Sequence, residues 1–173
     1  MTSTEPIAKV LVVCLGNICR SPLGEAVLRA QAKQRGLNIT VDSWYHVGED
    51  PDDVIGIFVE TWFTVPRRSV ATCKKVPVGL HTVYAPSTPR IQCSSDFTEF
   101  THILASDESN LRDIKRVMPP NTTADIRLWG SYLDGKSIPD PWYGGIGGFE
   151  STFQQCTSLS EAFLDHLTNN EEM

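Results

Sequence analysis

An apolar run that leads through a glycine-containing loop into a helix constrains the fold more than any other feature of the chain. Residues 8–13 (AKVLVV) are β-branched and almost entirely apolar, which is typical of a strand covered on both faces of a sheet. After the loop CLGNICR, Ser21 is expected as an N-cap and Pro22 as the first helical residue. Apolar residues recur at helical spacing over 23–35, and Gly36 is expected to end that helix.

The alternation of strand and helix patterns continues along the chain. ITVDS (39–43) is expected as a second strand, and a β-α-β unit implies a parallel pair with a right-handed crossover. Further on we expect strands over 101–106 and 124–130, a helix over 107–118 capped by Asp107, a loop over 131–148 and a helix over 149–167. This pattern predicts an α/β fold. We expect a three-layer α/β/α sandwich around a mostly parallel four-stranded sheet, with a phosphate-binding loop after the first strand.

Length and composition limit the class of protein. The 173 residues suit a single domain over 1–173, and 40% hydrophobic with 21% charged residues is ordinary for a globular chain. A formal net charge of −6 argues against nucleic acid as a partner. No stretch reaches the roughly 18 apolar residues of a membrane span, so no membrane partner is expected.

The cysteines and histidines show no framework for disulfides or metals. Five cysteines form an odd set without closely paired spacing, and four histidines are scattered along the chain. We therefore expect no metal and no cofactor. A reducing, cytoplasmic location is the simplest interpretation, and it leaves room for a reactive thiol.

The loop between Cys14 and Arg20 carries the clearest chemistry. A loop that enters a helix N-terminus directs backbone N–H groups at one point, where they bind an anion. Gly16 allows a tight conformation, and Arg20 can donate two parallel hydrogen bonds to oxyanion oxygens. These groups favour the thiolate of Cys14, while Ser21 can donate to its sulfur and Asn17 can hold the loop. The pattern predicts nucleophilic catalysis on a phosphate ester, with an ordinary strand–turn–helix as the alternative.

A phosphocysteine route also needs a general acid, and Asp140 is the candidate. Pro139 and Pro141 restrict the backbone on both sides of it, so its carboxylate is expected on a stiff loop. Trp142 and Tyr143 follow at once and can line a slot for an aromatic ring. An ordinary Asp-Pro turn is the alternative interpretation of this segment.

The motifs VCLGNICRSP, YHVGE, SDESNLRDIKRV, LWGSY, DPWYGG and FQQC…AFLDHL together resemble the low-molecular-weight protein tyrosine phosphatases. The resemblance covers roughly 7–53 and 94–167. It implies that Cys14 is the nucleophile, Arg20 binds phosphate and Asp140 is the general acid. It also implies a phosphate-binding loop that contains Leu15, Gly16, Asn17, Ile18, Cys19 and Ser21. The implied substrate pocket consists of Tyr45, Trp142 and Tyr143, and the implied redox pair is Cys14 with Cys19.

The resemblance also implies a setting and a substrate class. Members are cytoplasmic, metal-free and usually monomeric, and they cleave phosphotyrosine in proteins and small aryl phosphates. Trp142 is similar to fungal members, where many others carry tyrosine. The family braces the loop asparagine with a serine, here Ser43, and with a histidine, for which His81 is the candidate.

Departures from the family pattern are confined to 44–93. The segment DSWYHVG (42–48) is shorter than its family counterpart, an irregular insert occupies about 54–65, and 76–92 is divergent. Two further functions share the fold. One is a catalytically weakened relative that binds phosphate or phosphotyrosine, and the other is a thiol-dependent arsenate reductase. The reductases use two downstream cysteines a few residues apart, whereas Cys73 and Cys93 are twenty apart.

Overall fold

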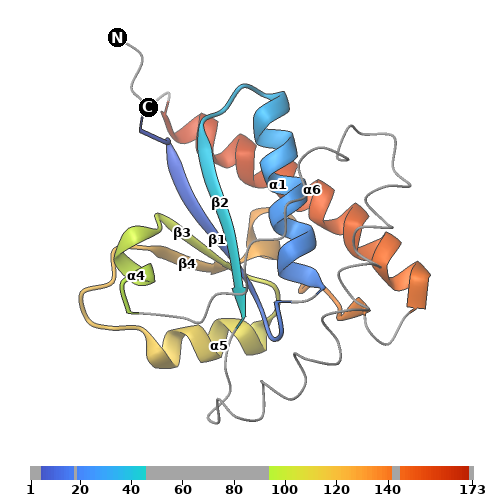
Figure 1. Cartoon of the computed structure of the whole chain (residues 1–173), viewed down its shortest axis with the longest axis horizontal. Coiled ribbons are helices and arrows are strands. Elements are labelled where there is room, and N and C mark those ends of the chain that lie inside the picture. Colours follow the sequence, from blue (N-terminus) through green and yellow to red (C-terminus); the bar gives the residue numbers. More distant parts are fainter. Residues whose placement is uncertain (1–4, 18, 46–93, 142–144, 172–173) are drawn as a thin grey trace.

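The computed structural model describes residues 5–17, 19–45, 94–141 and 145–171 (Figure 1). The irregular segments expected at 54–65 and 76–92 lie outside these residues. The described elements are, in chain order, β1 (Ala8–Cys14), α1 (Arg20–Gln34), β2 (Ile39–Tyr45), α4 (Asp96–Glu99), β3 (His102–Ala105), α5 (Glu108–Val117), β4 (Asp125–Leu128), the 3-10 helix η2 (Trp129–Tyr132) and α6 (Gly145–Glu171).

The four strands form one sheet in the order β2-β1-β3-β4, and every pair is parallel. The predicted four-stranded sheet is therefore confirmed, with all rather than most of its strands parallel. In the register, Cys14 pairs with Tyr45, and Val13 pairs with Ala105. The carboxyl ends of three strands thus meet beside Cys14, at the edge where open α/β sheets bind ligands.

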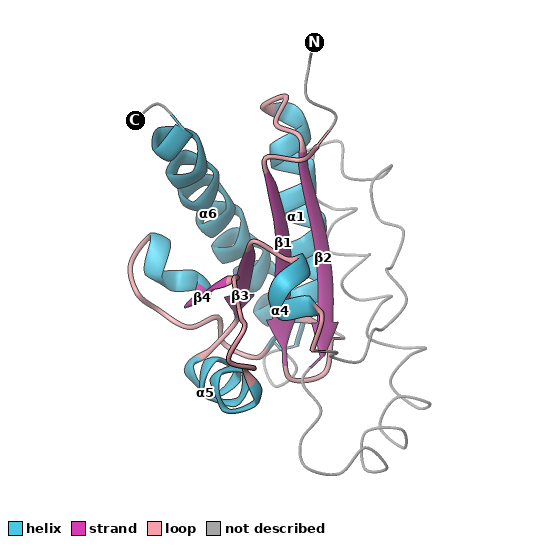
Figure 2. Cartoon of the chain, turned by 90° about the vertical axis from the view of Figure 1, so that its left-hand side faces the viewer, coloured by secondary structure: helices cyan, strands magenta, loops and turns pink. Residues whose placement is uncertain are grey.

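Alternate residues of β1 pack into separate cores on the two faces of the sheet. Val10 and Val12 lie in a core with residues of α1 and α6, whereas Leu11 and Val13 lie in a core with residues of α4 and α5. Figure 2 shows the sheet between these helices. All four side chains are fully buried, as a strand covered on both faces requires. This arrangement is the predicted three-layer sandwich.

Several element boundaries differ from expectation. The N-cap of α1 is Cys19 rather than Ser21, so Ser21 lies inside the first turn and its hydroxyl is used elsewhere. β4 ends at Leu128 and η2 follows, because the chain turns sharply there: a Cβ on Gly130 would lie 2.0 Å from the carbonyl oxygen of Lys136. α6 begins at Gly145, within the stretch expected to be loop.

Candidate active site

The loop after β1 brings Cys14 and the first turn of α1 together. Cys14 is the last residue of β1 and is 2% exposed. Asn17 has φ of 47°, in the left-handed region, which bends the chain back toward the helix. Leu15 differs from its neighbours because its side chain is 57% exposed. Among its described residues, the loop therefore has a buried polar interior and the apolar side chain of Leu15 on its outer surface.

A network of short polar contacts joins Cys14 to β2. The Ser21 hydroxyl lies 3.0 Å from Cys14 Sγ and 2.9 Å from Asn17 Oδ1. Asn17 Oδ1 also lies 3.0 Å from Ser43 Oγ, and Asn17 Nδ2 donates to the Ser43 carbonyl at 3.3 Å. The contact between Asn17 and Ser43 implied by the family resemblance is thus present. Ser43 therefore contacts both the oxygen and the nitrogen of the Asn17 side-chain amide.

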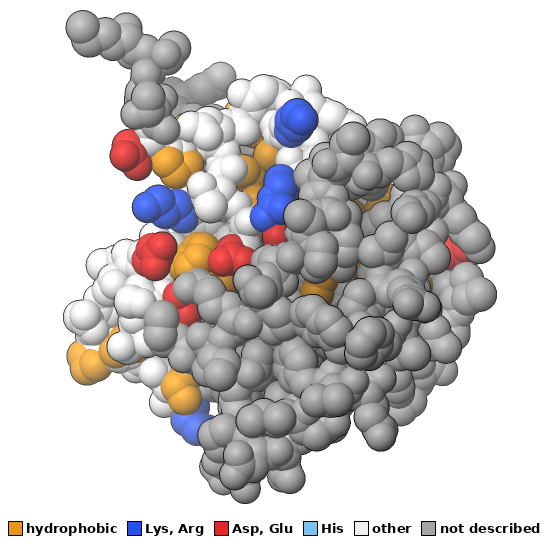
Figure 3. All heavy atoms as spheres, viewed as in Figure 1, with side chains coloured by type: hydrophobic (Ala, Val, Ile, Leu, Met, Phe, Trp, Pro, Cys, Tyr) orange, Lys and Arg blue, Asp and Glu red, His pale blue; other side chains and the backbone are white. Residues whose placement is uncertain are grey.

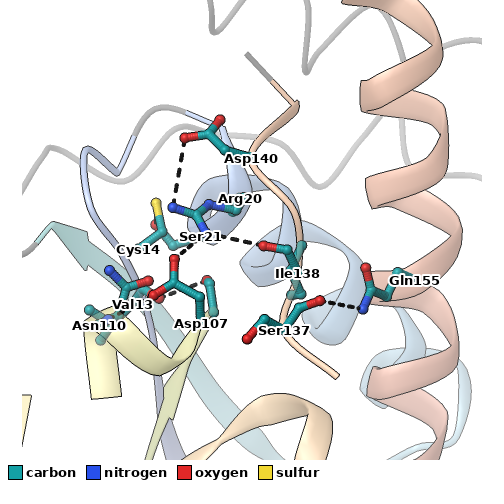
Figure 4. A network of polar contacts seen from close by, with 11 residues as sticks. Val13, Cys14, Arg20, Ser21, Asp107, Asn110, Ser137, Ile138, Asp140 and Gln155 are labelled. Carbon is teal, nitrogen blue, oxygen red and sulfur yellow. Dashed lines mark hydrogen bonds and ion pairs between the residues drawn. The ribbon is translucent and has the colours of Figure 1, made fainter. Parts of the chain in front are cut away.

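Arg20 is the most constrained charged group of the site (Figure 4). Its Nη1 donates to Asp107 Oδ2 at 2.5 Å and to the carbonyl of Ile138 at 3.1 Å. Its Nη2 lies 3.8 Å from Asp140 Oδ2. Burial acts to lower the pKa of Arg20, but the negative charges of Cys14, Asp107 and Asp140 outweigh it, and the pKa is raised. The guanidinium is therefore a permanent, oriented cation beside the sulfur.

Asp107 is a site residue that the sequence pattern assigned only to helix capping. Its Oδ1 accepts the backbone N–H of Asn110 at 2.7 Å, so the capping role is confirmed. Its other oxygen holds Arg20, a partner 87 positions away in the chain. The signal that points to this second role is topological. Asp107 follows β3, whose neighbour in the sheet is the strand that ends in Cys14.

The segment that carries Asp140 is anchored to both α6 and the sheet. Gln155 of α6 donates to the carbonyl of Ser137 at 3.1 Å, and the backbone N–H of Ile138 donates to the Ser106 carbonyl at 2.8 Å. Ser106 Oγ in turn donates to the carbonyl of Val13 at 2.7 Å. The backbone two residues before Asp140 is thus held, through Ser106, to Val13, the residue that precedes Cys14. The Asp140 side chain remains 39% exposed.

The structure brings some of the predicted site residues together and leaves others undescribed. Those that meet are Cys14, Asn17, Arg20, Ser21 and Asp140. Cys19 is buried against Phe149 of α6. Tyr45 ends β2 beside Cys14 in the register, and its side chain lies outside the described part. Ile18, Trp142 and Tyr143 also lie outside the described residues.

Three wider properties of the described residues give the site its setting. Within the described ranges, no three His, Cys, Asp or Glu side chains are placed to hold a metal ion. None of the described helices combines the length and apolar character needed to cross a membrane. On the described part of the face in Figure 3, basic and acidic side chains lie next to one another. At the Cys14–Arg20 loop, the guanidinium of Arg20 lies close to the Cys14 thiol and to the carboxyls of Asp107 and Asp140.

Comparison with known proteins gives one consistent result. The sequence model described as low molecular weight phosphotyrosine protein phosphatase matches residues 9–173. A protein of that name from Schizosaccharomyces pombe is 39% identical over 169 residues, which cover 92% of this chain and 96% of the relative. The human protein of that name is 37% identical over 166 residues, covering 90% and 93%. A crystal structure of a low molecular weight phosphotyrosine phosphatase from Vibrio cholerae has a TM-score of 0.74 at 27% identity, covering 94% of this chain and 98% of that one.

Proposed function

The chain belongs to the low molecular weight phosphotyrosine protein phosphatase family, and we propose that it hydrolyses phosphotyrosine in proteins and small aryl phosphates. The observation that carries this proposal is the position of Arg20. Its guanidinium lies beside Cys14, is fixed by Asp107 on one side and approaches Asp140 on the other. A dianionic phosphate above the sulfur fits this arrangement, with the carboxyl at the side where a leaving oxygen departs.

We propose the following reaction at this site. The Cys14 thiolate attacks phosphorus, a sulfur–phosphorus bond forms, and the bond from phosphorus to the phenolic oxygen breaks. Asp140 gives its proton to that oxygen as it leaves. Asp140 then takes a proton from water, which attacks phosphorus and releases phosphate and the Cys14 sulfur. The Ser21 hydroxyl, 3.0 Å from Sγ, supports the sulfur in both steps.

The remaining site assignments are proposals from family membership. The loop residues Leu15, Gly16, Asn17, Ile18, Cys19 and Ser21 surround the phosphate, and Tyr45, Trp142 and Tyr143 line the pocket for the aromatic ring. Cys19 protects the nucleophile: a peroxide oxidises Cys14 to a sulfenic acid, which condenses with the Cys19 thiol to a disulfide and water. A nucleophile that must stay reduced favours a cytoplasmic location, and we propose a monomeric single domain over 1–173.

The first test is hydrolysis of p-nitrophenyl phosphate by the wild type, Cys14→Ser and Cys156→Ser. We expect turnover by the wild type, none by Cys14→Ser, and near-normal turnover by Cys156→Ser, because Cys156 lies in the apolar core with residues of α1 and α6 and outside the Cys14–Arg20 loop. A folded wild type without turnover would support the phosphate-binding alternative instead and refute the enzyme. Reduction of arsenate with a thiol donor, assayed in parallel, separates the third function.

The second test concerns the acid. In Asp140→Ala we expect kcat to fall by roughly 100-fold or more for aryl phosphates with poor leaving groups, and far less for activated ones. Asp134→Ala, an exposed carboxylate of the preceding turn, is the control and leaves both unchanged. Equal losses on both kinds of substrate would remove Asp140 as the proton donor.

A further inference from the structure

The peptide unit that joins Ser137 to Ile138 is held from two opposite sides. Its carbonyl oxygen accepts a hydrogen bond at 3.1 Å from Nε2 of Gln155, and Figure 4 shows this side chain reaching Ser137 from α6. Its N–H donates at 2.8 Å to the carbonyl of Ser106, the residue that follows β3. The C=O and N–H of a trans peptide point in opposite directions, so the two hydrogen bonds together oppose rotation of the peptide plane.

This peptide unit lies close to Asp140 along the chain, and the torsions between them are restricted. The ring of Pro139 locks its φ, and Ile138 is restricted because a proline follows it. Pro141 restricts Asp140 in the same way. Between them, the carbonyl of Ile138 accepts a hydrogen bond from Arg20 at 3.1 Å. The orientation of the held peptide unit is therefore passed on to the carboxyl of Asp140.

Helix α6 also contacts the chain on the other side of Asp140. Gly148 lies seven residues before Gln155, which is about two turns of helix, so both residues lie on the same face of α6. A Cβ on Gly148 would lie 3.0 Å from the carbonyl oxygen and 3.3 Å from the Cα of Pro141. The backbone before Asp140 and the backbone after it thus both contact one face of α6.

We propose that Gln155 is a positioning residue for Asp140, because its amide holds the backbone from which the carboxyl extends. The inference deepens the proposed function and rests on it, since Asp140 is there the proton donor. Proton transfer requires the donor within about 2.6–3.2 Å of the leaving oxygen, so a small shift of this backbone lengthens the path of the proton. The proposal assigns Gln155 no contact with the substrate.

The first measurement is kcat/KM for phenyl phosphate and for p-nitrophenyl phosphate, which has the better leaving group. This constant covers the steps up to the departure of the phenol. Gln155→Met keeps the length of the side chain but removes its N–H donors. We expect kcat/KM for phenyl phosphate to fall about three- to tenfold, the effect of one hydrogen bond, and for p-nitrophenyl phosphate by less than about twofold. Gln154→Met, at the exposed glutamine next to it in α6, is the control and leaves both constants unchanged.

An Asp140→Ala background separates positioning from a general loss of structure. If Gln155 acts through the carboxyl of Asp140, Gln155→Met should change kcat/KM for phenyl phosphate by less than about twofold once that carboxyl is absent. A loss of the same size in both backgrounds would overturn the proposal, as would an equal loss on both substrates. Gln155→Glu is a second variant, because its carboxylate has no proton to give the Ser137 carbonyl and should act in the same direction.

Hydrogen exchange at the Ile138 amide tests the hold of Gln155 without any turnover. This N–H belongs to the peptide unit whose carbonyl Gln155 binds, so a loosened peptide unit exposes it to solvent more often. We expect its exchange rate, measured by NMR on isotope-labelled protein, to rise about three- to tenfold in Gln155→Met. The rate should stay unchanged in Gln154→Met. An unchanged rate in Gln155→Met would overturn the proposal.

The two measurements separate this inference from the proposed function. A folded wild type that cleaves neither ester would refute the proposed function, and the role of Gln155 with it. A wild type that cleaves both esters, with the exchange rate or the substrate preference unaltered in Gln155→Met, would refute the role of Gln155 alone.

Discussion

Gly24 of α1 is packed directly against the indole of Trp129, and this contact supports a quantitative prediction. A Cβ built on Gly24 would lie 2.5 Å from Trp129 Cζ3, 3.0 Å from Cη2 and 3.4 Å from a methyl of Val12. Carbon atoms prefer separations of about 3.5–4.0 Å, so the ring would have to move by roughly 1 Å. Trp129 is fully buried in the core between the sheet and the helices α1 and α6, and it has no open space to move into.

Two opposing effects decide the stability of Gly24→Ala. Overpacking a buried site costs about 1–3 kcal/mol, while replacing glycine by alanine inside a helix gains about 1 kcal/mol. We therefore expect the free energy of unfolding to fall by about 1 kcal/mol, equivalent to about 2–4 °C in Tm for a chain of this size. In a Trp129→Leu background the clash is absent, so the same substitution should raise stability by up to about 1 kcal/mol.

Urea unfolding of the four proteins of this cycle, followed by circular dichroism, measures the coupling between the two positions. Gly147→Ala is the matched control, since nothing lies within 4 Å of a Cβ at that helical glycine, and it should be neutral or slightly stabilising. If Gly24→Ala destabilised the wild type and the Trp129→Leu background equally, the indole would not be the cause and the packing argument would be refuted.

Two further predictions concern charged and titratable groups. Asp107→Asn keeps an acceptor for the N-cap of α5 but removes the charge that holds Arg20. The kcat for p-nitrophenyl phosphate should therefore fall about 10- to 100-fold while the helix content stays unchanged. An unchanged kcat would contradict the orienting role of Asp107. Burial, assisted by Asp125 and opposed by Arg127, raises the pKa of Tyr132 from 10.0 to about 12. As pH rises, the unfolded chain therefore loses the Tyr132 proton before the folded chain does, and the free energy of unfolding should fall as pH rises from 10 to 12. Urea midpoints measured across this range test the expectation, and Tyr132→Phe should lessen the fall. An unaltered pH dependence in Tyr132→Phe would show that Tyr132 is not its source.

The parts of the fold that sequence could predict are those set by local patterns. The apolar run before Cys14 and the helix-spaced residues after it are specified by neighbours along the chain, and the structure has both. Ser21 shows the limit of such reasoning. Its type and position suit an N-cap, but the left-handed Asn17 bends the loop so that the helix begins earlier. Its hydroxyl then meets Cys14.

Features that depend on distant partners were not predictable. The ion pair between Asp107 and Arg20 forms because β3 pairs with β1, and no local sequence pattern predicts that pairing. Glu25 is equally ordinary in sequence, a helical glutamate four residues before an arginine, typical of an exposed ion pair. In the structure Glu25 is 4% exposed, and its carboxylate accepts a hydrogen bond from Ser43 of β2 at 2.6 Å.

The strand that ends in Cys14 has a consequence for how the protein is made. β1 pairs on one side with β2, a near neighbour in sequence, and on the other with β3, where the Lys9 backbone bonds to Thr101, 92 positions later. A growing chain therefore exposes one open edge of β1 until β3 has been synthesised, and such an edge can pair with other chains. Closure of that edge also brings Asp107 to Arg20. The surroundings of Arg20 are thus completed, and an open strand edge is covered, in the same late folding event.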